Sequence, residues 1–398
     1  MRILHTSDWH LGRTLHGVDL TEAHAAYLDH LVEVVRSERV DAVVVAGDVY
    51  DRAIPPADSV TLLGEALARL TELTRVVLTP GNHDSAVRLG FSAALLDERL
   101  SIRTRVPDVG RPTLLPDAEG GVGAYVYPLP YLDPDMARAD LAEPGDDGEP
   151  VRPPRSHEGV VTAAMARVHA DLARRRAGDA TRVPAVVMAH AFVAGGEASE
   201  SERDLRVGGI EVVPSGVLAS GTADVDYAAL GHLHGPQRVG GRVPARYSGS
   251  PVAFSFSEEH HVKSSVLVDL AGGEVSTELV EAPVLRRLAT LTGTIDELTS
   301  GSFDHHAGDH VRVRVTDATR PAHMRSRILE HLPHLLVLFH EPDGATPVVG
   351  PLRVTAAEDP VEIAAQFVAD AGGAEATAPE RDALRAAVEA AEAMRRSA

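Results

Sequence analysis

The chain has 398 residues, no cysteine and a formal net charge of −20 at pH 7. This length is typical of two or three domains, and the lack of cysteine excludes a disulfide scaffold. The acidic balance argues against a protein that coats nucleic acid through bulk charge attraction, but it leaves room for a local cationic groove or for metal ions. The longest apolar runs fall well short of the ~18–20 residues of a membrane span, and the first residues lack the apolar core of a secretory signal. We therefore expect a cytoplasmic protein without a membrane partner.

Short apolar runs and amphipathic segments alternate in the N-terminal part of the chain. The apolar runs predict buried strands, and apolar residues at helical spacing predict helices. The predicted strands are Arg2–His5, Ala42–Ala46 and Val76–Leu78, and the predicted helices are Glu22–Glu38 and Ser59–Leu73. This alternation is typical of an α/β fold, in which the loops after strand ends carry the chemistry.

A polar, proline-rich stretch follows. Residues 133–149 contain seven acidic residues against one basic residue, so we expect a mobile insertion over about 133–158 without regular structure. Helical spacing returns at Val160–Arg176. Two strand-like runs, Ala185–Met188 and Val225–Leu230, then lead to segments that contain histidine.

The sequence pattern changes after Pro283. The predicted strands are Leu288–Thr294, His310–Val315 and Leu335–Phe339, with a helix at Ala322–His331. We expect a first domain over 1–283, a small α/β domain over 284–343, a linker over 344–357 and two helices within 358–398. Each terminal helix begins with a capping residue, an early proline and a glutamate. The two helices either pack on their own chain or present a surface to a partner.

Five clusters of carboxylate, imidazole and amide side chains follow apolar runs. They are Asp8-Trp9-His10, Gly47-Asp48-Val49-Tyr50-Asp51, Gly81-Asn82-His83-Asp84, Ala189-His190 and Gly231-His232-Leu233-His234. One histidine after a strand is usually an ordinary loop residue, but five such clusters in succession indicate a common site. Residues i and i+2 of an extended chain project to the same side. The pairs Asp8/His10 and His232/His234 can therefore each direct two ligands into one cavity.

The candidate ligands supply oxygen and imidazole nitrogen but no sulfur. They are Asp8, His10, Asp48, Asn82, His190, His232 and His234. This set favours Mn²⁺ or Fe²⁺ and also accepts Zn²⁺ or Mg²⁺. Seven ligands exceed the need of one ion, so we predict a site for two divalent ions.

The order Asp-x-His, Gly-Asp-x-x-Asp, Gly-Asn-His-Asp, His and Gly-His-x-His resembles the calcineurin-like metallophosphoesterases. Four segments narrow this resemblance to the SbcD family of bacterial nuclease subunits; they are Met1–Gly12, Val45–Arg52, Gly231–Gly235 and Tyr247–Pro251. The similarity covers about residues 1–285. It implies an α/β fold with a β-sandwich flanked by helices, a DNA-capping α/β domain, and C-terminal helices that bind an SbcC-like ATPase.

The resemblance also implies a role for each site residue. Asp8, His10 and His234 would hold one ion, Asn82, His190 and His232 would hold the other, and Asp48 would bridge the two ions, which are Mn²⁺ by preference. His83 would face the phosphate and protonate the departing 3′ oxygen, with Asp51 orienting it by a hydrogen bond.

For other residues near these motifs, the sequence gives a weaker indication of a functional role. Asp84 is expected to accept hydrogen bonds behind the ligands, and Arg52 to contact phosphate or pair with an acid. Trp9, His5 and His16 are interpreted as structural. The segment 199–203 resembles one that the family places near the active site, but as a sequence it is a charged loop.

The function implied by the resemblance is a Mn²⁺-dependent nuclease subunit that acts in DNA repair and recombination. It would cut double-strand ends and hairpins as a 3′–5′ exonuclease and single-strand endonuclease, with an SbcC-like ATPase partner and as a homodimer through its early helices. The chain lacks a Gly-rich nucleotide loop, so ATP hydrolysis would reside in the partner. Arg312 and Arg314 either meet DNA phosphates or form a solvated strand face.

Two alternatives remain. One is a phosphoesterase that acts on small phosphodiesters, and the other is a non-catalytic clamp for DNA ends. The second domain and the terminal helices argue against a small substrate. The complete ligand set argues against a clamp.

Overall fold

The computed structural model describes residues 1–146, 148–178, 182–202, 212–219, 223–342, 360–372 and 376–397. Contacts divide the chain into two units. The larger unit comprises Met1–Val315 and Pro321–His340, and the smaller one comprises Thr316–Arg320 and Glu341–Ala398. The predicted linker over 344–357 lies outside the described residues. None of the helices in the described part of the chain is both long enough and apolar enough to span a membrane.

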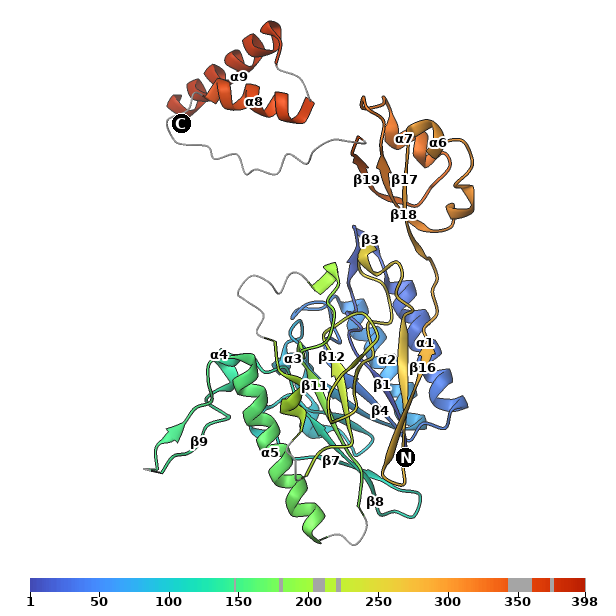
Figure 1. The fold of residues 1–398 in the computed structure, drawn as a ribbon, viewed down its shortest axis with the longest axis vertical. Coiled ribbons are helices and arrows are strands. Elements are labelled where there is room, and N and C mark those ends of the chain that lie inside the picture. The colour runs from blue at the N-terminus through green and yellow to red at the C-terminus, as the bar shows by residue number, and fades with distance from the viewer. Residues whose placement is uncertain are drawn as a thin grey trace. The chain divides into compact units, whose positions relative to one another are not determined.

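Two six-stranded sheets form the body of the larger unit (Figure 1). The first has the order β16-β15-β1-β4-β5-β6, with bounds Glu274–Glu281, Ser264–Ala271, Arg2–Thr6, Ala42–Ala46, Arg75–Thr79 and Leu100–Ile102. The second has the order β13-β14-β12-β11-β8-β7, with bounds Gln237–Val239, Ala245–Tyr247, Tyr227–Gly231, Ala185–His190, Val122–Pro128 and Thr113–Pro116.

The side chains of the first sheet alternate between two hydrophobic cores. Ala42 and Val44 face the second sheet, whereas Val43 and Val45 face the helices on the outside. These helices are α1 (Thr21–Ser37) and α2 (Ala57–Leu73), and α5 (His157–Gly178) covers the outer face of the second sheet. Strands that are buried on both faces have continuous apolar sequences. This is why β4 is predictable from its sequence.

Strand direction brings several loops to one edge of each sheet. In the first sheet β1, β4 and β5 run parallel, and in the second β8, β11, β12 and β14 run parallel. Parallel strands end at the same edge, where the following loops gather. The two such edges meet at one rim of the sandwich, where side chains of each sheet contact the main chain of the other.

The predicted elements of the N-terminal part agree with the observed ones within one or two residues at each end. Several strands are not predicted by the sequence pattern, among them the long strands β8, β15 and β16. β16 alternates half-buried and exposed residues and carries three glutamates, which weakens its apolar signal. β8 contains a glycine and ends in a proline, both of which are depleted in strands. Pairing with neighbouring strands outweighs these local preferences.

Regular structure also occurs in the acidic insertion, where none is expected from composition. The helix α4 spans Pro134–Ala137, β9 (Glu143–Pro144) pairs with β10 (Pro150–Val151), and α5 begins at His157. Ala137 is buried against the core of the second sheet. A few apolar anchors therefore order a segment whose composition is mainly acidic.

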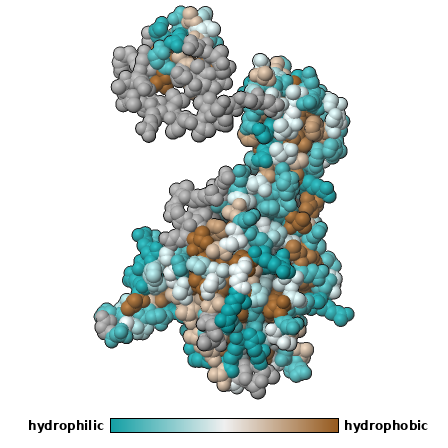
Figure 2. Space-filling view, in the orientation of Figure 1, coloured by the Kyte–Doolittle hydropathy of each residue, from teal (hydrophilic) through white to brown (hydrophobic). Residues whose placement is uncertain are grey.

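The small domain has its own sheet and core. Its three parallel strands lie in the order β17-β18-β19, with bounds Leu288–Gly293, His310–Val315 and Leu335–His340. The short helices α6 (Ile295–Leu298) and α7 (Met324–Leu329) complete the core. Leu288 and Leu336 also pack against a group of body residues that includes Phe254. In Figure 2 the visible surface is largely hydrophilic, with separate hydrophobic patches.

The smaller unit contains the two helices predicted at the C-terminus. α8 spans Pro360–Gly372 and α9 spans Ala378–Ser397. The two helices pack against each other, and Arg381 forms an ion pair of 2.9 Å with Glu362. Thr377 and Glu380 are hydrogen-bonded at the start of α9, as the predicted capping pattern requires.

Candidate metal centre

All seven predicted ligands lie at the rim where the parallel strands end. Asp8 and His10 follow β1, Asp48 follows β4, and Asn82 follows β5. His190 is the last residue of β11, while His232 and His234 follow β12. The side chains therefore come from both sheets, and only the packing of one sheet on the other brings them together.

Two glycines allow segments of the chain to approach closely at this rim. A Cβ atom on Gly231 would lie 2.0 Å from the main-chain oxygen of Ala46 in the facing sheet. A Cβ atom on Gly81 would lie 2.1 Å from Oδ1 of Asp48. Neither position has room for a side chain. The glycines that precede the clusters are thus required by close approach.

Four of the candidate ligands have left-handed backbone conformations. The φ angles are 55° at Asp8, 45° at His10, 50° at Asp48 and 109° at His232. Positive φ is uncommon for residues other than glycine, and it is often found where function requires a strained backbone. Its concentration on these ligands indicates that the chain is bent to aim their side chains into one place.

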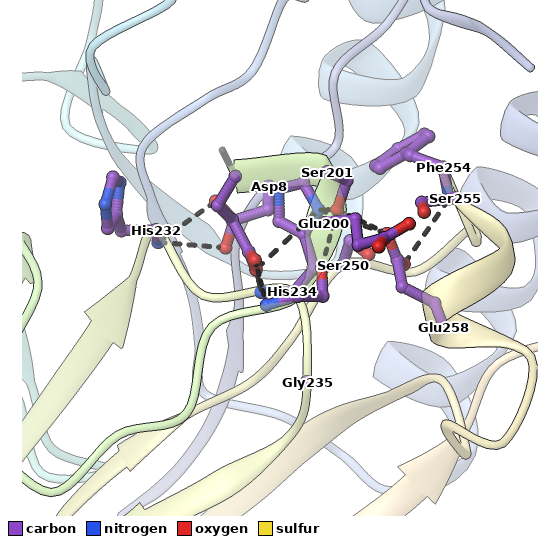
Figure 3. A network of polar contacts seen from close by, with 12 residues as sticks. Asp8, Glu200, Ser201, His232, His234, Gly235, Ser250, Phe254, Ser255 and Glu258 are labelled. Atoms are coloured by element: carbon purple, nitrogen blue, oxygen red, sulfur yellow. Dashed lines mark hydrogen bonds and ion pairs between the residues drawn. The ribbon is translucent and has the colours of Figure 1, made fainter. Parts of the chain in front are cut away.

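The first group of ligands is centred on His10 and His234. Their Nε2 atoms lie 3.2 Å apart. The carboxylate oxygens of Asp8 accept the main-chain N–H of His232 at 3.0 and 3.1 Å (Figure 3). One donor atom from each of Asp8, His10 and His234 lies within 4.8 Å of the others. This spacing would allow the three side chains to share one ion.

The second group consists of Asn82, His190 and His232. Oδ1 of Asn82 lies 3.0 Å from Nε2 of His190 and 3.2 Å from Nδ1 of His232. Oδ2 of Asp48 lies 3.3 Å from Nε2 of His190 and 3.5 Å from Nε2 of His10. Asp48 therefore lies between the two groups, where a shared carboxylate would have to be.

The hydrogen bonds of His190 test whether this arrangement fits a cation. Its Nδ1 lies 2.9 Å from the main-chain oxygen of Ala46, so Nδ1–H donates there and the neutral ring carries its lone pair on Nε2. That lone pair faces oxygen atoms of Asn82 and Asp48, which is unfavourable unless a proton or a cation lies between them. The donor set therefore fits a metal.

The pKa values of the ligands in this second group, and that of Asp48, also fit a site for a metal ion. Burial alone would lower the pKa of His190, but the Asp48 carboxylate outweighs burial and raises that pKa to about 9. A proton then takes the place of the cation when metal is absent. Burial alone would also raise the pKa of Asp48, but His190 and His10 hold it well below its usual value. Burial lowers the pKa of His232 to about 3, which keeps that ring in the neutral form that binds metals.

Asp84 links the two loops that carry Asp48 and Asn82. Its carboxylate accepts the main-chain N–H groups of Val49 at 3.0 Å, Tyr50 at 2.9 Å and Gly81 at 2.9 Å. Burial and the nearby charge of Asp48 raise the pKa of Asp84 to about 6. Its geometry is that of a hydrogen-bond acceptor behind the ligands.

His83 lies beside the first group of ligands. Its main-chain N–H donates to Oδ1 of Asp48 at 2.9 Å, and its ring meets that of His10 edge to face at 4.7 Å. Nδ1 of His83 lies 2.8 Å from the main-chain oxygen of Asp51 rather than from its carboxylate. The Asp51 carboxylate is instead 3.8 Å from Nδ1 of His10 and 3.7 Å from Nε of Arg13. The geometry thus differs from the expected side-chain pair, because the loop after β4 turns a carbonyl toward His83.

Arg52 and the residues interpreted as structural have different surroundings. The guanidinium of Arg52 is 3.7 Å from Asp51, and 61% of its side chain is exposed. Trp9 is buried and donates from Nε1 to Thr6. His5 is buried between Tyr227 and the main-chain oxygen of Leu230.

His16, which is interpreted as structural, and Arg312 both contact other protein groups. His16 has a ring tilted against Phe256, with the centroids 5.5 Å apart. Arg312, a candidate for phosphate contact, lies over the ring of Phe256 at 5.1 Å and donates to Thr290.

Four residues near His234 have no role predicted from the sequence. Ser201 lies 2.6 Å from Nδ1 of His234, and Glu202 accepts the main-chain N–H of His234. The segment 199–203 has the sequence of an ordinary charged loop, but Ser201 and Glu202 contact a candidate ligand; Arg203 lies outside the described residues. Glu258 and Lys263 are buried behind Ser201. Lys263 is the only lysine in the sequence. This rarity is the one sequence feature that could have drawn attention to these four residues.

The sequence is similar to a known family and to several named proteins. The profile of the calcineurin-like phosphoesterase family matches residues 1–134. The chain is 40% identical over 314 residues to the D subunit of the SbcCD nuclease of Rhodobacter capsulatus, which covers 75% of this chain and 74% of the relative. It is 38% identical to the protein of the same name from Bacillus subtilis over 80% of each chain. It is 33% identical to that of Escherichia coli K12 over 75% of this chain and 73% of the relative.

Proposed function

Because this chain belongs to the family of SbcCD nuclease D subunits, within the calcineurin-like phosphoesterases, we propose that it is a Mn²⁺-dependent nuclease subunit that hydrolyses DNA double-strand ends and hairpins. The chain is a hydrolase, and its described residues include groups of aspartate and histidine that could hold a metal ion. The finer proposal adds 3′–5′ exonuclease and single-strand endonuclease activity. It also includes an SbcC-like ATPase as the partner. The proposed location is the cytoplasm, and the proposed processes are DNA repair and recombination.

The observation that carries this proposal is the convergence of seven oxygen and nitrogen donors from two sheets. Their arrangement around Asp48 supports two divalent ions. When bound, two such ions activate a water molecule and neutralise charge on the phosphate. Oxygen and imidazole ligands favour Mn²⁺, and Mg²⁺, Fe²⁺ and Zn²⁺ are the alternatives.

His83 has the position of a proton donor at this centre. It adjoins His10 and Asp48 without filling a place in either of the two ligand groups that share Asp48. Its Nδ1 is engaged by the main-chain oxygen of Asp51, so Nε2 is the nitrogen that would face a substrate. A histidine held in this way can donate a proton to a leaving oxygen. His83 also lies within 4.8 Å of donor atoms of His10 and Asp48, so metal counting must accompany any test of this role.

The test is cleavage by the purified full chain with Mn²⁺. Linear duplex, hairpin DNA and bis-nitrophenyl phosphate are supplied separately, with and without an SbcC-like ATPase, and Asp48→Asn is the inactive control. We expect Mn²⁺-dependent cleavage of both DNA substrates. Cleavage of bis-nitrophenyl phosphate alone would instead indicate a phosphoesterase for small substrates. No cleavage in any combination would indicate a DNA-end clamp.

The two terminal helices are the proposed binding site for the ATPase. Ala365 and Val361 are buried within the α8–α9 unit, whereas the large apolar side chain of Phe367 is 63% exposed. An exposed aromatic residue on a small helical unit is a typical anchor for a partner. Removal of residues 358–398 should abolish co-purification with the ATPase and leave Mn²⁺-dependent cleavage by the chain alone. Retained co-purification would place the interface elsewhere.

A homodimer through the early helices is supported by a patch of three apolar residues. Val87, Phe91 and Leu95 are 84%, 90% and 86% exposed and are spaced four residues apart, across α3 (Ala86–Leu89) and the turn at Ala93–Leu95. Exposed apolar clusters of this kind often mark interfaces. Phe91→Glu should convert a dimer into a monomer in light-scattering measurements. A wild-type chain that is monomeric at micromolar concentration would contradict this part of the proposal.

A further inference from the structure

Lys263 is a buried residue in contact with a candidate metal ligand. It is 4% exposed and lies just before β15. Its Nζ donates to the main-chain oxygen of His234 at 3.0 Å, to Oγ of Ser250 at 2.8 Å, and to Oε2 of Glu258. An ammonium group has three N–H donors on one atom, and here each has an acceptor. The position therefore suits lysine and would not suit the planar guanidinium of arginine, although arginine makes up all the rest of the Lys and Arg residues of this sequence.

Glu258 lies between Lys263 and the imidazole of His234. It is 1% exposed, and its Oε1 accepts the O–H of Ser201 at 2.5 Å and lies 3.5 Å from Nδ1 of His234. Ser201 in turn lies 2.6 Å from that same Nδ1 (Figure 3). Three loops thus meet behind His234. The contacts run from His234 through Ser201 and Glu258 to Lys263.

The direction of these hydrogen bonds determines the tautomer of His234. Glu258 is paired with an ammonium group, so it is a carboxylate and can only accept. Ser201 must then donate its single O–H to Glu258 and accept from Nδ1–H of His234. The lone pair of the neutral ring is consequently on Nε2, the atom that faces His10 at 3.2 Å.

We propose that Lys263 is a positioning residue, which through Glu258 and the main-chain oxygen of His234 holds this imidazole in the tautomer and orientation that bind one of the two divalent ions. The proposal rests on the proposed function, since it assumes the binuclear site. Carboxylates behind a metal-bound histidine fix its tautomer and orientation, and their loss typically lowers metal affinity about 10–100-fold. Loss of Lys263 leaves Glu258 buried without its counter-ion and frees the loop that carries His234.

The test measures Mn²⁺ binding to the full chain by titration calorimetry and by electron paramagnetic resonance. The wild type should bind two ions, and Lys263→Met should weaken one of them about 10–100-fold and leave the other unchanged. Arg176→Met is the control, because it breaks an ion pair of 2.8 Å with the buried Asp226, which also pairs with Arg182 at 2.7 Å, away from the ligands. It should lower the melting temperature without changing either Mn²⁺ affinity.

Two more variants separate positioning from folding. Lys263→Met combined with Glu258→Gln removes the unpaired charge, so it should recover the melting temperature that Lys263→Met loses but not the affinity for Mn²⁺. Ser201→Ala, at a half-buried position, should weaken the same ion in a chain that folds normally. The inference is wrong if Lys263→Met binds both ions like the wild type, or if both ions weaken equally. A wild type that binds fewer than two ions would instead refute the proposed function.

Discussion

The Nε2 atoms of His10 and His234 face each other at 3.2 Å although the two residues are 224 positions apart in sequence. Both side chains are buried. If Nδ1 of His234 donates to Ser201, Nε2 of His234 carries a lone pair, and it can accept a proton from His10 or bind a cation. Nδ1 of His10 has no hydrogen-bond partner among the described residues. A cation shared by the two Nε2 atoms would satisfy both lone pairs.

Removal of metal should destabilise the protein and change its protonation. A ligand present at 100 times its dissociation constant adds about 2.7 kcal/mol to the free energy of unfolding, so chelation should lower the melting temperature of the wild type. Because the pKa of metal-free His190 is raised to about 9, Mn²⁺ binding at pH 8 should release a proton. Calorimetric titrations in buffers of different ionisation enthalpy measure this release. Identical binding enthalpies in all buffers would show that no proton is displaced.

His83→Gln should retain both metal ions and lose nearly all nuclease turnover. General acid catalysis typically contributes about 10²–10⁴-fold, so we expect kcat to fall by that factor while the Mn²⁺ content remains at two. Asp51→Asn keeps the main-chain oxygen that holds His83, and its effect should be at least tenfold smaller. If His83→Gln lost a metal ion, His83 would be a ligand and not a proton donor.

Substitution of Gly81 and Gly64 by alanine should have opposite effects. A Cβ on Gly81 would lie 2.1 Å from Oδ1 of Asp48, whereas Gly64 in α2 has no described atom within 4 Å of the added Cβ. Gly81→Ala should abolish the binding of at least one ion and cost about 1–3 kcal/mol through overpacking. Gly64→Ala should add about 0.5–1 kcal/mol through helix propensity. Urea unfolding and metal analysis measure both. Normal metal binding by Gly81→Ala would show that this close approach is not required.

Acid should destabilise the fold below about pH 6.5. Burial lowers the pKa of His5 to about 3 and that of His24 to about 4. The unfolded chain takes up protons on these residues from pH 6.5 downward while the folded chain does not, so each residue's contribution is fully present above that pH and is lost as the pH falls toward the folded pKa. The slope is about 1.4 kcal/mol per pH unit for each residue.

His24→Leu tests the acid prediction. Neither ring nitrogen of His24 has a partner in hydrogen-bonding geometry within the described part of the chain, so leucine removes the titrating group at little cost in hydrogen bonding. The pH dependence of the unfolding free energy should flatten between pH 6.5 and 4. If the unfolding free energy of His24→Leu depended on pH as strongly as that of the wild type, His24 would not be a source of the acid sensitivity.

The sequence by itself determined the local structure of the body and the identity of the candidate ligands. Apolar runs such as Ala42–Ala46 are strands because both of their faces are buried. The residues that follow them include polar candidate ligands, which lie at the rim because parallel strands end at the same edge. Strands such as β16, with half-buried and exposed residues and several charges, have no strong local signal. They form because they pair with neighbours.

Only the tertiary structure decided how the ligands meet and what lies behind them. The pairing of His10 with His234, the carbonyl rather than the carboxylate of Asp51 on His83, and the contact of Lys263 with the main chain of His234 all join residues on separate loops. These relationships depend on the packing of one sheet against the other. Local sequence patterns report which face of a strand is buried, but they carry no information about which distant side chain lies opposite.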